Sequence, residues 1–169
     1  MTTVNSVNTY IVATATNEVT MPLQPAFGAY IVANDLNVTG NDTLYTVGTN
    51  QAWTETFDQN ADFNVNGTIT APVTGRYQIS TTVRMDGYVA ANTSYIIINT
   101  SNGDYNVSNT NGLALINNTG TLSQGGSIFA DMDAADTAVV QVLVNGEGAD
   151  IIDLVSINRQ IFFGAALIC

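Results

Sequence analysis

Apolar and polar residues alternate with a period of two along much of the chain, whereas a helical period is sustained almost nowhere. The clearest alternation spans residues 76–84, where one face of the predicted strand consists of Tyr77, Ile79, Thr81 and Val83. A strand of this kind is typical of an antiparallel sheet with one face in the core and one in water. The pattern therefore predicts an all-β protein.

Further strands are predicted between clusters of Gly, Asn and Asp, the residues that favour turns. They span residues 27–32, 53–57, 63–65, 68–71, 94–99, 112–116, 127–131, 138–144, 151–155 and 161–168. Residues 38–42 and the pair Gly125-Gly126 are expected to form turns. The spacing of the strands favours an antiparallel two-sheet jelly-roll sandwich. The last strand is uncharged and the most apolar, so we expect it in the middle of a sheet, because an exposed apolar edge invites aggregation.

Three of the predicted strands are apolar on both faces, namely those that contain residues 95–98, 139–144 and 161–168. In an antiparallel sandwich only one face of each sheet meets the core, so the second face of such a strand needs another cover. A partner subunit is the simplest cover. Loops of the same chain are the alternative.

Charged residues are scarce and mostly acidic. Among 169 residues, enough for one domain with a sizeable core, 10% are charged and the net charge is −11, with no histidine and three Lys or Arg residues, Arg76, Arg84 and Arg159. Nucleic-acid binding and attraction to an anionic membrane both need clusters of basic residues, so neither partner is expected. We expect the arginines to be paired with carboxylates. The sequence also has no stretch of about 18 apolar residues and no signal-peptide pattern, so neither a membrane span nor conventional export is expected.

The inventory of reactive side chains argues against an enzyme. Without histidine and lysine the usual general bases and nucleophile activators are missing, and the single cysteine has no evident activating partner. No cofactor is expected. The acidic cluster of Asp131, Asp133 and Asp136 is a weak calcium candidate, because it lacks the glycine and the terminal glutamate of an EF-hand loop. A turn before strand 138–144, capped by Asp136, is the simpler interpretation.

Five segments resemble, in the same order, the globular head of complement component 1q and the wider tumour-necrosis-factor-like superfamily. They are Pro25-Ala-Phe-Gly-Ala-Tyr30, the Phe-Asp loop at 57–63, the Gly-to-Tyr segment 67–77, the turn and strand at 133–140, and Phe162-Phe-Gly-Ala-Ala-Leu167. Two departures mark a divergent member: Ile69 replaces the usual aromatic residue, and Ala135 stands where a Gly commonly precedes the Asp. The resemblance implies a ten-stranded TNF-like jelly roll that forms a tight threefold homotrimer. It does not by itself imply a function.

The strands with two apolar faces, taken together with this resemblance, supply the trimer-interface candidates: Tyr95, Ile97, Val140, Val142, Phe162, Phe163 and Leu167. Residues 25–169 form the predicted head. Residues 1–24 form an arm that contains neither a Gly-X-Y repeat nor coiled-coil heptads. Its residues Tyr10, Ile11, Val12 and Val19 are candidates for pairing with a neighbouring protein by strand addition. The alternatives are a disordered tail or an extra edge strand of the same barrel.

These features together suggest a non-enzymatic virion protein. The first hypothesis is a bacteriophage capsid decoration (cement) protein, a trimer on the outer capsid surface that binds the major capsid protein through the arm and assembles in the host cytoplasm. The alternatives are a tail-fibre or spike tip that binds host glycans, for which Trp53, Tyr88 and Tyr105 are candidates, and a secreted complement-like recognition module. Core packing or loop pinning is the simpler explanation for the three aromatic residues.

Overall fold

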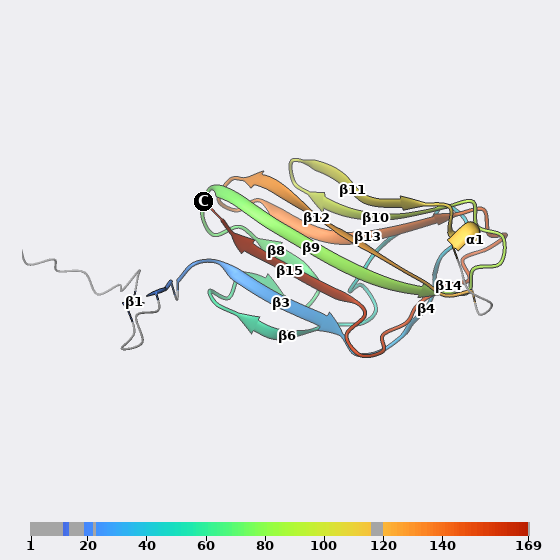
Figure 1. The fold of residues 1–169 in the computed structure, drawn as a ribbon, viewed down its shortest axis with the longest axis horizontal. Coiled ribbons are helices and arrows are strands. Elements are labelled where there is room, and N and C mark those ends of the chain that lie inside the picture. The colour runs from blue at the N-terminus through green and yellow to red at the C-terminus, as the bar shows by residue number, and fades with distance from the viewer. Residues whose placement is uncertain (1–11, 14–18, 22, 116–119, 169) are drawn as a thin grey trace, which may run out of the picture.

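Two antiparallel sheets pack face to face and enclose one core (Figure 1). A computed structural model describes residues 12–13, 19–21, 23–115 and 120–168. The first sheet has the strand order β4-β14-β9-β15-β3-β6, with β12 paired to β9, and is called the β9 sheet. The second has the order β11-β10-β13-β8-β7, with β5 paired to β13, and is called the β13 sheet. The all-β, TNF-like jelly-roll prediction is confirmed.

The β9 sheet is built around the long strand β9 (Gly75–Asp86). Strand β12 (Leu122–Met132) pairs along its whole length, and β15 (Phe162–Leu167) and β14 (Ile152–Leu154) pair on its other side. Strands β3 (Ala26–Ile31), β6 (Trp53–Asp58) and β4 (Asp35–Thr39) complete the sheet. The final strand β15 lies between β9 and β3, so the prediction that it is central is confirmed.

The β13 sheet is built around β13 (Thr137–Asn145) and β10 (Thr93–Thr100). Strand β11 (Gly103–Thr110) forms a hairpin with β10, and the short strands β5 (Leu44–Thr46), β7 (Phe63–Asn64) and β8 (Thr68–Thr70) lie on the other side of β13. The residues of β13 and β10 alternate between wholly buried and partly exposed. This alternation assigns every second side chain to the core and the others to the outer face.

Four aromatic side chains form the centre of the core. The ring of Phe27 stacks on Phe63 with a centroid distance of 4.3 Å, and Phe163 meets Phe27 edge-on at 5.1 Å. Trp53 lies 5.8 Å from Phe163, and its indole Nε1 donates a hydrogen bond to the carbonyl of Val47. Burial of each ring stabilises the fold by about 2–3 kcal/mol. The cluster contains residues of both sheets and so joins them.

Three predictions of local structure are wrong. The strand expected at 112–116 is wrong over its described part, because Gly112–Leu115 is the one-turn helix α1, whose first turn is capped by the Asn111 side chain accepting the Ala114 N–H at 3.3 Å. Gly125 and Gly126 are not a turn but lie inside β12. Val38 and Thr39 of the expected turn 38–42 belong to β4, which pairs with β14.

The amino-terminal arm contributes a small separate sheet. Val12–Ala13 (β1) pairs antiparallel with Val19–Thr20 (β2), beyond the end of the sandwich (Figure 1). Tyr10 and Ile11 lie outside the described residues. No helix in the described ranges is both long and apolar enough to cross a membrane.

Candidate functional site

The outer face of the β9 sheet has no charged residue in its three central rows, where directly paired residues share a face. One row aligns Phe129, Gln78, Ala166 and Ala26, the next Ser127, Ser80, Gly164, Gly28 and Phe57, and the third Gly125, Thr82, Phe162, Tyr30 and Thr54. These rows are called the β9 face. The ion pairs of Arg76 with Asp131 and of Arg84 with Asp86 lie beyond its two ends. In a chain with a net charge of −11, an uncharged surface of this kind is one where a second acidic molecule meets little direct repulsion.

Two aromatic side chains project from the β9 face. Phe129 on β12 is 67% exposed, and Phe57 on β6 is 51% exposed. Toward the centre of the β9 face, their neighbours are Ala, Ser, Thr, Gln and Gly, and the nearest charged residue along β12 is Asp131, one row beyond Phe129. Contiguous apolar surface of this kind marks an interaction site on a soluble protein.

A shallow groove crosses the middle of the β9 face because two paired strands have no side chains there. Gly164 pairs directly with Gly28, and a Cβ on Gly28 would lie 2.8 Å from the ring of Phe57. Hollows of about 320 and 300 Å³ lie on either side of the Phe57 and Phe162 rings. Gly28 and Gly164 therefore let Phe57 lie flat on the sheet and leave room for an inserted side chain.

Arg159 lies at the margin of this groove. Its guanidinium carbon is 4.5 Å from the centre of the Tyr30 ring, a cation–π contact, and it lines the 300 Å³ hollow with Phe57 and Phe162. The expected pairing of arginines with carboxylates is confirmed for Arg76, 2.9 Å from Asp131, and for Arg84, 3.7 Å from Asp86. Within the described residues, Arg159 has no such carboxylate.

The structure separates the trimer-interface candidates into three groups. Val140, Val142 and Phe163 are 0% exposed within one protomer, so their assignment to an interface is wrong. Successive side chains of a strand point to opposite faces, so the residues next to these three point outward. Leu167 is partly buried and packs against the core. Phe162 lies on the β9 face, whereas Tyr95 and Ile97 are partly exposed on the outer face of the β13 sheet.

A second apolar strip crosses the outer face of the β13 sheet. Tyr95 pairs with Leu143, and Leu143 pairs with Leu44, which is 50% exposed. Ile97 lies in the adjacent row next to Gln141. The two apolar surfaces are therefore on opposite sides of the sandwich.

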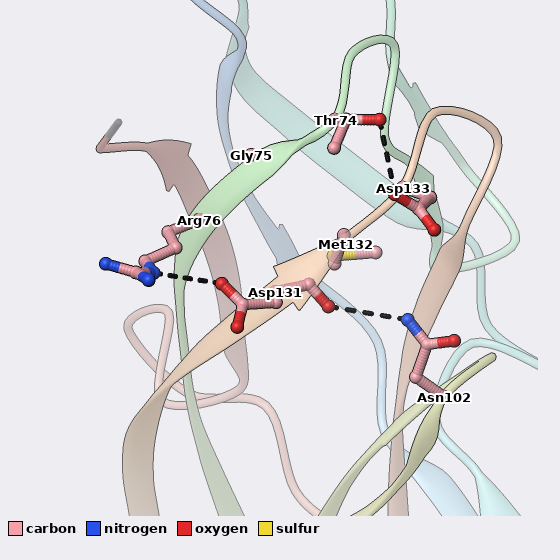
Figure 2. Close-up of a pocket in the computed structure, with 7 residues that line it drawn as sticks. All are labelled: Thr74, Gly75, Arg76, Asn102, Asp131, Met132 and Asp133. Carbon is pink, nitrogen blue, oxygen red and sulfur yellow. Dashed lines mark hydrogen bonds and ion pairs between the residues drawn. The ribbon is translucent and has the colours of Figure 1, made fainter.

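A polar pocket of about 430 Å³ lies at one end of the sandwich, where the β8–β9, β10–β11 and β12–β13 connections converge (Figure 2). Its lining consists of Thr74, Gly75, Arg76, Asn102, Asp131, Met132 and Asp133. Asn102 donates to the backbone carbonyl of Asp131, and Thr74 donates to the Asp133 carboxylate. Planar polar groups surround the opening, and the carboxylates of Asp131 and Asp133 are its only candidates for a general base, since its lining contains no His, Lys, Cys or Tyr.

Asp136 closes the turn beside this pocket. Its Oδ2 accepts the backbone N–H of Asp133 at 2.8 Å and the Asn102 side chain at 2.6 Å. The Asp133 N–H lowers the pKa of the Asp136 carboxyl below its ordinary value, with a further contribution from Ser101. The turn with Asp136 as its cap is confirmed. In the described part of the chain, no group of three or more His, Cys, Asp or Glu residues is placed to hold a metal ion.

A buried carboxylate that the sequence did not single out holds the loop at the opposite end. Oε1 of Glu147, a residue only 5% exposed, accepts the backbone N–H groups of Val89, Ala90 and Ala91 at 2.8, 2.9 and 2.9 Å. Such a cluster of backbone N–H donors is typical of an anion-binding site. Here it is filled from within the chain, so Glu147 is a structural clamp.

The aromatic candidates for glycan stacking are mostly unavailable. Trp53 and Tyr88 are 2% and 3% exposed, so core packing is confirmed for both. The Tyr88 hydroxyl contacts Ser94 Oγ at 2.7 Å, and burial raises the pKa of Tyr88 to about 12. Ser94 also accepts the Gln124 side chain at 2.8 Å, which links the two sheets. Tyr105 is partly exposed on β11.

Comparison with known proteins identifies the fold. No protein-family model and no curated protein matches the sequence. Among solved structures, murine APRIL at pH 5.0 is similar over 86% of this chain and 99% of that chain, with 9% identity and a TM-score of 0.57. The globular domain of zebrafish complement 1qA protein (86% and 98% covered, 14% identity, TM-score 0.54) and Eiger TNF from S. frugiperda (86% and 94% covered, 10% identity, TM-score 0.54) are similar as well. The chain therefore has the fold shared by tumour-necrosis-factor-like proteins and the complement 1q head.

Proposed function

We propose that this chain is a non-enzymatic binding module that forms a homotrimer through the β9 face and, as a trimer, decorates the outer surface of a virus particle. The observation that carries the self-association is the absence of charge from that face. Copies that carry a net charge of −11 repel one another, and the central rows of the β9 face place no charged side chain in the contact.

The β9 face also contains two unlike features that complement each other. Phe129 projects from β12, which has no strand partner beyond β9 in this sheet, while the groove between Phe57 and Phe162 lies on the other side of β9. A projecting feature that fits a different feature of the same molecule makes a heterologous contact, and such contacts close into rings. A threefold ring agrees with the resemblance to trimeric tumour-necrosis-factor-like proteins.

The finer part of the proposal, particle binding, is supported by the second apolar strip. Because Leu44, Tyr95 and Leu143 lie on the opposite side of the sandwich from the β9 face, a trimer closed through the β9 face leaves this strip uncovered. Uncovered apolar surface on a stable assembly fits a second protein partner, here the major capsid protein. The arm of residues 1–24 would add strand pairing to that contact. No cofactor is required by this function.

Light scattering of the full-length protein over a range of concentrations tests the self-association. We expect the mass of three chains, unchanged after addition of a calcium chelator, and a shift to the mass of one chain in Phe129→Asp, whose exposed position leaves folding intact. A monomeric wild type would refute the trimer. Cosedimentation with phage capsids that lack their decoration protein tests the finer part, and binding that is unchanged by deletion of residues 1–24 would refute the role of the arm.

Glycan recognition is the second candidate, and the polar pocket at the end of the sandwich favours it. Its planar side chains, Arg76, Asn102 and Asp131, are of the kind that hydrogen-bond paired hydroxyl groups (Figure 2). A glycan array would show hits that are lost in Asn102→Ala. An array without hits for the wild-type trimer would contradict this candidate.

A further inference from the structure

Arg159 is the described cation without an ion-pair partner in a chain that has fourteen acidic residues and three Lys or Arg residues. Arg76 and Arg84 each lie within 4.0 Å of a carboxylate, whereas Arg159 contacts the Tyr30 ring. A contact with the face of a ring uses none of the five N–H donors of the guanidinium. These donors remain available to a carboxylate, for which the guanidinium edge is the preferred partner.

The backbone around Arg159 is held in an unfavourable conformation. Asn158 and Arg159 have φ angles of 53° and 61°, in the left-handed region, and neither is glycine. Non-glycine residues avoid this region and persist there where the surrounding structure fixes them. The turn is fixed by the Gln160 N–H donating to the Ile157 carbonyl at 3.1 Å, and by Arg84 donating to the Gln160 side chain at 2.7 Å. Arg159 is therefore fixed in place at the margin of the groove.

We infer that Arg159 receives a carboxylate from a neighbouring copy of this chain when the β9 faces associate, and that it provides the electrostatic selectivity of an otherwise uncharged contact. This inference rests on the self-association proposed above and adds the residue that recognises the partner. Arg159 shares the hollow with Phe57 and Phe162, so a molecule that fills the groove must pass close to its guanidinium.

The occupant is a second copy for reasons of charge. Each copy offers fourteen acidic side chains, and β12, the strand that carries Phe129, also carries Asp131, which is on the same face and has an 82% exposed side chain. Arg159 is exposed in the single protomer, and a second copy that covers the groove would shield its guanidinium from water, where it binds a carboxylate more strongly than in open solvent. A copy placed with the wrong face toward the groove would leave Arg159 desolvated and unpaired, which disfavours that arrangement.

Sedimentation velocity of the full chain tests the inference with Arg159→Gln and, for comparison, Arg76→Gln, which removes the same charge but frees the Asp131 carboxylate from its ion pair and so should not weaken the contact. At 50 mM NaCl we expect self-association of Arg159→Gln to be roughly tenfold to a hundredfold weaker than that of Arg76→Gln, a range typical for a partly desolvated charge pair. The gap should shrink at 500 mM NaCl, because salt screens the ion pair. Arg159→Lys should fall between wild type and Arg159→Gln, since it keeps the charge but loses the bidentate geometry.

The outcomes separate this inference from the proposed trimer. If wild type is monomeric at both salt concentrations, both are refuted. If wild type is trimeric and the two glutamine variants associate equally at 50 mM NaCl, the trimer stands and the role of Arg159 is refuted. Circular dichroism of each variant shows whether it is folded. Should Arg159→Gln be unfolded, the comparison of Arg159→Lys with wild type at the two salt concentrations decides, and equal association then refutes the inference.

Discussion

Ala135 lies in the turn between β12 and β13 with a φ of 76°, a left-handed conformation that L side chains avoid. Its N–H donates to the Ala71 carbonyl at 2.7 Å, and the next residue, Asp136, donates to Asp133 at 3.0 Å. The turn therefore holds Ala135 in this conformation through hydrogen bonds on either side. Tumour-necrosis-factor-like proteins commonly have glycine at this place, which removes the conflict between the side chain and the backbone.

Replacing Ala135 with glycine should stabilise the protein. The left-handed conformation costs a non-glycine residue about 1–2 kcal/mol, and glycine adds about 0.4–1 kcal/mol of unfolded-state entropy that opposes the gain. The difference is a net stabilisation of about 0.5–1 kcal/mol. For a chain of this length that corresponds to a rise in Tm of roughly 1–4 °C. Because Ala135 is exposed, the substitution opens no cavity.

Urea unfolding followed by circular dichroism, at one fixed protein concentration, measures this change. Ala134→Gly is the matched control, because Ala134 is exposed in the same turn but has no positive φ. There the entropy cost acts alone, and we expect a loss of about 0.5–1 kcal/mol. If Ala135→Gly is no more stable than wild type, or is destabilised as much as Ala134→Gly, the argument from backbone strain is refuted.

Three further predictions concern the carboxylates and the buried phenol. Glu147→Ala should lower the free energy of unfolding by about 3 kcal/mol and Glu147→Gln by about half as much. Three N–H donors lose a charged acceptor in the first variant and keep a neutral one in the second. Urea unfolding measures both losses, and equal losses would contradict the account. Asp136→Asn should be less stable than wild type at pH 7, and the difference should vanish as the pH falls through the lowered pKa of Asp136. A carboxyl whose pKa is lowered by folding contributes stability above its unfolded-state pKa, and this stability is lost on protonation. Unfolding curves between pH 2 and pH 7 check this, and a difference in stability that persists in acid would argue against it. The raised pKa of Tyr88, about 12, contributes stability that is complete below pH 10 and is lost as the pH rises toward 12; Tyr88→Phe should show a shallower alkaline decline in Tm, and an unchanged slope would refute the assignment.

Strands were predictable from sequence where a local signal specifies them. The alternation of Tyr77, Ile79, Thr81 and Val83 determines which face of β9 is buried, and all four are buried as expected. Strand β11 was missed because its residues, Gly103–Thr110, are mainly polar on both faces, as suits a strand at the edge of the β13 sheet. Polar edge strands resemble loops in composition, so only pairing with β10 reveals them.

The pair Gly125-Gly126 was wrongly predicted to form a turn, because glycine is needed there for contacts with strands that are distant in the sequence. A Cβ on Gly125 would lie 2.3 Å from the Thr81 carbonyl, and one on Gly126 would lie 2.7 Å from the Val107 carbonyl. Glycine in this strand therefore permits close approach of two neighbouring backbones and does not mark a turn. No neighbour along the sequence indicates this contact.

The candidate interface shows the same limit. A strand that is apolar on both faces indicates that a second cover is needed, but it does not say which residues face outward. Val140 and Val142 are wholly buried, while Val139 and Leu143 on either side of them are partly exposed. The β9 face was harder to find, because its rows combine residues from five separate strands. Its lack of charge appears only when the strands are aligned in register.

The distribution of charge makes the salt dependence of assembly a sensitive measure of the contact. General repulsion between copies of net charge −11 weakens association at low salt, so added salt should strengthen a contact made only by uncharged groups. An ion pair at Arg159 has the opposite dependence. If both act, association of the wild type should respond less to salt than association of Arg159→Gln, in which only the repulsion remains. The net charge of the chain and the ion pair at Arg159 therefore make opposite, separable contributions to the salt dependence of association.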